Sequence, residues 1–60
     1  MSTVPLILIV DDDKDYREVL SAKLISKGFL VKIARDGNEG VEMAKKHLPS
    51  LILMDVQMSG

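Results

Sequence analysis

The chain has 60 residues, enough for one small domain or part of one, so we expect no second domain within it. Its formal net charge is −1, with 8 basic and 9 acidic residues and no basic run, so we expect no direct nucleic-acid binding. It has no cysteine, which excludes disulfides and thiolate metal sites and fits a reducing, cytoplasmic setting. The longest apolar stretch is far shorter than a membrane span requires, so we expect a soluble protein that does not contact a membrane.

The first predicted element is an uninterrupted aliphatic run, Leu6–Val10, which stops at three aspartates. A short continuous run predicts a strand covered on both faces, as in a parallel sheet. Apolar side chains then recur every three or four positions, which predicts an amphipathic helix. They are Tyr16, Val19, Leu20 and Leu24. Gly28 stands where a left-handed residue would end this helix, and Asp13 or Asp15 could accept hydrogen bonds from its first free amides.

Residues 29–34 predict a second, outer strand, because Lys32 interrupts the apolar segment and would point outward. Asp36 and Gly37 are typical of a turn and a helix start. A second helix follows and is ended by Pro49, with a basic last turn that suits the negative end of the helix dipole. Its apolar positions are Val41, Met43, Ala44 and Leu48.

A third aliphatic run, Leu51–Met54, ends at Asp55, so the order of elements is βαβαβ. With right-handed crossovers and the third strand on the far side of the first, the sheet order becomes 2-1-3. The chain is therefore predicted to be an α/β protein with a parallel sheet. Ligands of such sheets bind beyond the carboxyl ends of the strands, where the winding direction reverses. Asp11, Asp12 and Asp55 are all expected at this point.

Three converging carboxylates repel one another and favour binding of a cation. Oxygen ligands in a chain without cysteine suit a hard divalent ion, and Mg²⁺ commonly joins one or two carboxylates to a phosphate oxygen. Asp55 could then attack an activated phosphorus and become an acyl phosphate. Read in isolation, the Asp11-Asp12-Asp13 run is equally typical of a turn that only stops a strand and caps a helix.

Residues 8–13, the pair Asp36-Gly37 and residues 51–60 resemble, in order and spacing, the opening motifs of response-regulator receiver domains. The resemblance covers essentially the whole chain and implies a flavodoxin-like fold, of which residues 1–60 would be a truncated domain with the first three strands and two helices. It implies a phosphoacceptor signalling module of two-component systems rather than an enzyme, phosphorylated by a histidine kinase or phosphotransfer protein.

The resemblance also implies roles for individual residues. Asp55 would be the phosphoacceptor, Asp12 would bind Mg²⁺ directly, Asp11 would act through a metal-bound water, and the backbone carbonyl of Gln57 would supply a further ligand. Ser59 departs from the family, which usually has proline there. The family's switch hydroxyl and phosphate-gripping lysine would lie beyond Gly60, so we expect reduced activity from this segment alone.

Two other interpretations remain open. The chain could be an inactive structural fragment that associates with a second copy through its exposed third strand, forming a homodimer. It could also be a phosphatase with an aspartate nucleophile, although Asp15 stands where that motif has Thr or Val. A calcium-binding EF-hand loop is excluded, because Tyr16 and Ala22 replace the required glycine and glutamate.

Overall fold

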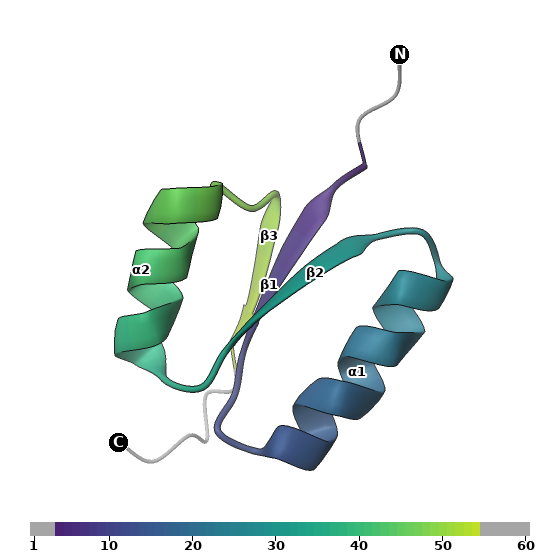
Figure 1. Cartoon of the computed structure of the whole chain (residues 1–60), viewed down its shortest axis with the longest axis horizontal. Helices are drawn as coiled ribbons and strands as arrows, with labels where there is room; N and C mark the ends of the chain where they lie inside the picture. The colour runs from purple at the N-terminus through teal and green to yellow at the C-terminus, as the bar shows by residue number, and fades with distance from the viewer. Residues whose placement is uncertain (1–3, 55–60) are drawn as a thin grey trace.

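The computed structural model describes residues 4–54 of the chain. Its elements follow in the order β1 (Leu6–Val10), α1 (Lys14–Ser26), β2 (Leu30–Ala34), α2 (Gly37–His47) and β3 (Leu51–Met54). The three strands are parallel and form one sheet in the order β2-β1-β3 (Figure 1). The predicted α/β class, element order and sheet order are therefore confirmed.

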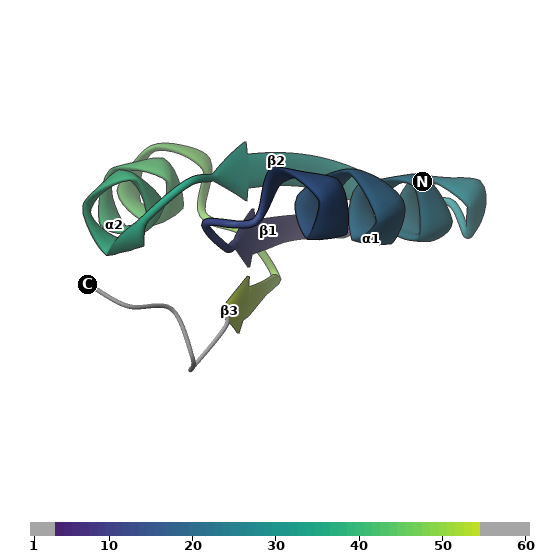
Figure 2. The same ribbon diagram turned by 90° about the horizontal axis from the view of Figure 1, so that it is seen from below.

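The two helices lie on opposite faces of the sheet, with β1 between its neighbours (Figure 2). Each helix packs against β1 and β2. Strand β1 is thus covered on both faces and paired along both edges, and Ile7, Leu8, Ile9 and Val10 are at most 4% exposed. This double burial explains why the strand is an unbroken aliphatic run without alternating polar residues.

Both ends of α1 are closed by the residues that the sequence suggested. The carboxylate of Asp13 accepts hydrogen bonds from the amides of Asp15 and Tyr16, at 3.0 and 3.2 Å. At the other end Gly28 has a φ of 95°, a left-handed conformation that is open to glycine. The Phe29 amide reaches back to the Leu24 carbonyl across this turn, so β2 begins at Leu30, one residue later than predicted.

The exposure of α1 differs from the predicted apolar face. Leu20 and Leu24 are half-buried, but Tyr16 and Val19 are 53% and 67% exposed. The helix packs against β1 and β2, and within residues 4–54 no element covers the side that carries Tyr16 and Val19. The periodicity located the helix correctly, and the packing decided which part of its apolar stripe became covered.

Helix α2 begins as predicted, because the Asp36 carboxylate accepts a hydrogen bond from the Glu39 amide at 2.9 Å. The prediction that Leu48 belongs to the apolar face of this helix is wrong. Leu48 caps the helix in a left-handed conformation with a φ of 49°, and it is 81% exposed. Pro49 disfavours the helical conformation for the residue before it, so the chain turns away at Leu48 and carries its side chain out of the core.

Strand β3 is paired but not covered. It is in register with β1, with Ile7 opposite Leu51 and Val10 opposite Met54, yet neither helix packs on it. Leu51, Ile52 and Met54 are 51%, 44% and 53% exposed. Within the described part of the chain, this strand therefore presents apolar side chains and one unpaired edge.

Neither helix in residues 4–54 has the length and apolar character that a membrane crossing needs.

Helix α2 packs tightly on β1 at Gly40, the only buried residue of α2 in the described structure. A Cβ at this position would lie 2.9 Å from Cγ2 and 3.3 Å from Cγ1 of Val10, which is itself 1% exposed and stiff because it is β-branched. Gly37, at the start of the same helix, has open space where a Cβ would be.

We predict that Gly40→Ala lowers the free energy of unfolding by about 1 kcal/mol, because overpacking of about 1–3 kcal/mol exceeds the gain in helix propensity of about 1 kcal/mol. Gly37→Ala is the matched control and should be neutral or stabilising. Thermal unfolding followed by circular dichroism measures both, with a Tm shift of about 4–8 °C per kcal/mol. Equal Tm values for the two variants would contradict the close packing of α2 on β1.

Candidate functional site

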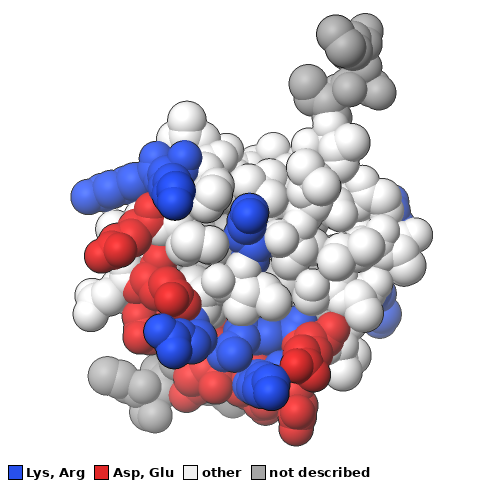
Figure 3. Space-filling model, in the orientation of Figure 1, with Lys and Arg blue, Asp and Glu red and all other residues white. Residues whose placement is uncertain are grey.

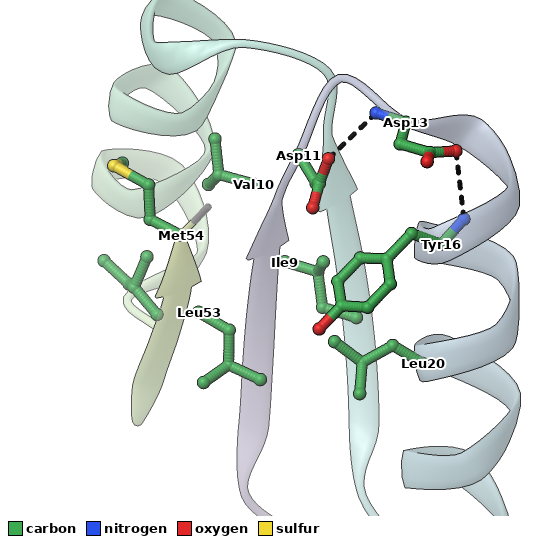
Figure 4. A pocket seen from close by; sticks show the side chains of 9 residues that line it. Ile9, Val10, Asp11, Asp13, Tyr16, Leu20, Leu53 and Met54 are labelled. Carbon is green, nitrogen blue, oxygen red and sulfur yellow. Dashed lines mark hydrogen bonds between the residues drawn. The ribbon is translucent and has the colours of Figure 1, made fainter. Parts of the chain in front are cut away.

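A groove lies between α1 and β3 at the carboxyl end of the sheet (Figure 4). Its volume is about 710 Å³. Two acids, Asp11 and Asp13, stand at one end, and the Asp11 carboxylate and Tyr16 ring face the same space. The remaining wall is apolar and comes from both neighbouring strands and α1. It consists of Ile9, Val10, Leu20, Ile52, Leu53 and Met54.

Asp11 is the acid that the fold holds most firmly, and it is only 3% exposed. Its amide donates to the Ala34 carbonyl of β2 at 3.1 Å, which continues the strand pairing one residue past β1. Its Oδ1 accepts a hydrogen bond from the Asp13 amide at 2.9 Å. A carboxylate buried to this extent needs such partners, because its desolvation is costly. The sheet therefore fixes where this acid lies.

The Asp11 carbonyl is held by Arg17, which closes the first turn of α1. The Arg17 Nη1 atom donates to this oxygen at 2.7 Å, a short distance typical of a charge-assisted hydrogen bond. The carbonyl belongs to the peptide that joins Asp11 to Asp12. One guanidinium group therefore fixes the peptide between two of the predicted metal-binding residues.

The other two acids of the run have different surroundings. Asp12 is exposed and is not among the residues that line the groove. Asp13 lines the groove and caps α1 through the hydrogen bonds described above. The turn-and-cap interpretation therefore describes Asp13 well, whereas the burial of Asp11 exceeds what a helix cap requires.

Asp55 and Gln57, the predicted phosphoacceptor and carbonyl ligand, lie outside the described residues. The structure therefore shows only Asp11 and Asp12 of the predicted metal ligands. Within residues 4–54, no group of three His, Cys, Asp or Glu side chains comes together in a way that could hold a metal ion. The pairing of Val10 with Met54 is the last register position that the structure describes between β1 and β3.

Charges around the site are mixed. Acidic and basic side chains alternate along the edge where β1 ends and α1 begins, as the lower margin of Figure 3 shows. A surface of one sign, which would attract a polyanion such as nucleic acid, is not visible on this face.

Sequence reasoning missed two residues of the site. Tyr16 was assigned to the buried face of α1, but its ring borders the groove beside Asp11. Arg17 was not among the predicted site residues, yet it is half-buried and its guanidinium donates a hydrogen bond to the Asp11 carbonyl. The sequence did contain a signal for Arg17, because this residue stands four positions after the helix cap Asp13. Residues four apart lie on the same face of a helix, so the Arg17 side chain is expected beside the acidic turn.

Comparisons with known proteins agree with this architecture. Residues 7–60 match the family described as the response regulator receiver domain. The chain is 42% identical over 52 residues to the response regulator MprA of Mycobacterium ulcerans, covering 87% of the chain and 22% of that protein. It is 38% identical over 56 residues to the transcriptional activator protein PfeR of Pseudomonas aeruginosa, covering 93% of the chain and 18% of that protein.

A third relative, the probable transcriptional regulator ycf27 of Guillardia theta, is 31% identical over 58 residues, covering 97% of the chain and 23% of that protein. The chain thus spans about a fifth of the length of these relatives. The family match extends over nearly all of the chain, and the parallel β2-β1-β3 sheet agrees with part of a receiver fold. The chain belongs to the response regulator receiver domain family.

Proposed function

We propose that this chain is the phosphoacceptor module of a two-component response regulator and takes up a phosphoryl group on Asp55. The observation that supports this most directly is the register of β1 and β3, in which Val10 is opposite Met54. One further residue of the same pairing would put Asp55 opposite Asp11, at the spacing of adjacent strands, about 4.8 Å. Residues in register on parallel strands point to the same face, which for Asp11 is the groove.

The donor set suits Mg²⁺, a hard ion that prefers oxygen ligands. Asp11 is buried at the end of β1 and Asp12 follows it in an exposed position, so one carboxylate is fixed by the protein and the next is open to solvent. In the proposed site Asp12 and Asp55 bind the ion directly, Asp11 binds through a water, and Gln57 contributes its carbonyl. When bound, Mg²⁺ would neutralise charge on the transferring phosphoryl group.

In the proposed reaction, a carboxylate oxygen of Asp55 attacks the phosphorus of a phosphohistidine on a histidine kinase or phosphotransfer protein. A P–O bond forms as the P–N bond breaks, and the released imidazole takes up a proton. A small phosphodonor could replace the partner protein. The chain's own contribution is to hold Asp11 and Asp12 beside the acceptor, so it serves as the receiving partner in signalling.

We predict that Asp55→Asn abolishes phosphoryl uptake from a small phosphodonor in the presence of Mg²⁺, because the amide lacks the nucleophilic carboxylate oxygen. Intact-mass spectrometry measures the added phosphoryl group, and omission of Mg²⁺ should prevent its addition to the wild-type chain. Asp15→Asn is the matched control, since it removes the same charge from an exposed position in the first turn of α1.

The competing structural interpretation is decided by the same measurement. If the wild-type chain takes up no phosphoryl group and binds no Mg²⁺ at millimolar concentration, the phosphoacceptor role of this chain is wrong. If Asp55→Asn is phosphorylated as well as the wild type, the acceptor is another residue.

We also propose that two copies of the chain associate through β3. The described part of the strand has an unpaired edge and exposes Leu51, Ile52 and Met54, and neither helix covers it. Pairing this edge with the same edge of a second copy across a two-fold axis would satisfy the free backbone groups and bury apolar surface.

We predict that Ile52→Lys shifts the chain from dimer to monomer, because a charge on an edge strand opposes strand pairing. Val19→Lys is the control, since it removes an exposed aliphatic side chain from α1, away from β3. Sedimentation velocity at micromolar concentration measures the masses. A well-folded monomeric wild type would disprove association through β3.

A further inference from the structure

We propose that Arg17 is a positioning residue of the acidic site, whose guanidinium sets the direction of both Asp11 and Asp12 by holding the peptide between them. This role rests on the proposed Mg²⁺-dependent function. It is distinct from that of the predicted ligands, because Arg17 acts through the backbone.

The geometry leaves the Asp11-Asp12 peptide few alternatives. The Asp11 amide, which belongs to the preceding Val10–Asp11 peptide, donates to the Ala34 carbonyl of β2 at 3.1 Å and so fixes the backbone just before the Asp11–Asp12 peptide. The carbonyl of the Asp11–Asp12 peptide itself accepts a hydrogen bond from Arg17 Nη1 at 2.7 Å. Rotation of this peptide would break the Arg17 bond and turn the Asp12 side chain with it. Strand and helix together therefore fix the backbone from which the exposed carboxylate extends.

Arg17 is itself anchored. Its amide donates to the Asp13 carbonyl at 3.0 Å, as part of the first turn that Asp13 caps. The Asp13 amide in turn donates to Asp11 Oδ1 at 2.9 Å. These contacts form a closed chain of hydrogen bonds from Asp11 through Asp13 and Arg17 back to Asp11. Loss of the guanidinium opens this ring at the bond nearest to Asp12.

A simple electrostatic role for Arg17 predicts the opposite effect on metal binding. A cation next to acidic ligands repels Mg²⁺, so removing it for charge reasons alone would tighten binding. If Arg17 positions the ligands, its removal should weaken binding, because partners that orient metal ligands typically change affinity about 10–100-fold when mutated. The sign of the change therefore separates the two roles.

The test is a Mg²⁺ titration of the whole chain followed by two-dimensional NMR, for the wild type and for Arg17→Ala. We expect the Mg²⁺ dissociation constant to rise about 10-fold or more in the variant. Amide hydrogen exchange is read from the same samples without metal. Exchange at the Asp13 amide should accelerate in Arg17→Ala, while exchange at Leu8, in the buried strand, should change little.

Two further variants serve as controls. Lys14→Ala removes an equal charge from an exposed position in the first turn of α1 and should leave the Mg²⁺ dissociation constant unchanged or lower it. Arg17→Lys keeps the charge with a single-point donor in place of the planar fork and should restore part of the affinity. It also keeps the question answerable if Arg17→Ala does not fold.

The outcomes distinguish this inference from the proposed function. Wild-type binding with equal or tighter binding by Arg17→Ala overturns the positioning role and leaves the magnesium site standing. Absence of Mg²⁺ binding by the wild type overturns the magnesium site, and the exchange data then decide whether Arg17 holds the acidic turn. Unchanged exchange at the Asp13 amide would show that it does not.

Discussion

The parallel pairing of β1 with both β2 and β3 is the constraint on which the rest of the described structure depends. It buries Ile7, Leu8, Ile9 and Val10 between two helices and two strands, and it continues one residue further through the hydrogen bond from the Asp11 amide to the Ala34 carbonyl. The pairing therefore carries an aspartate into a position that is only 3% exposed. An acid placed there by the sheet itself is a fixed element of the site rather than a side chain on a free loop.

The fold offsets the cost of that burial locally. The Asp11 carboxylate accepts a hydrogen bond from the Asp13 amide, and the Asp11 carbonyl accepts one from the Arg17 guanidinium. The turn that carries the acids is therefore also the turn that starts α1. Helix capping and site construction use the same residues. This coupling is why a change in the first two turns of α1 should affect both the stability of the helix and the geometry of the acids.

Strand β3 has the opposite character, because it is ordered by pairing alone. Its register with β1 is defined over four positions, while its side chains are largely exposed and neither helix packs on it. The groove beside it is apolar along most of its length and acidic at one end.

The sequence by itself determined the strand at Leu6–Val10, the left-handed turn at Gly28, the helix start at Asp36 and the order of elements, because these depend on local patterns and on backbone conformations that few residues adopt. It left the N-terminal cap of α1 open between Asp13 and Asp15, and the structure selects Asp13. Only the tertiary structure decided which apolar residues became covered. It also brought Gly40 against Val10 and placed Arg17 on the Asp11 carbonyl. Each of these depends on how a helix sits on the sheet, and helical periodicity alone leaves that rotation and distance undetermined.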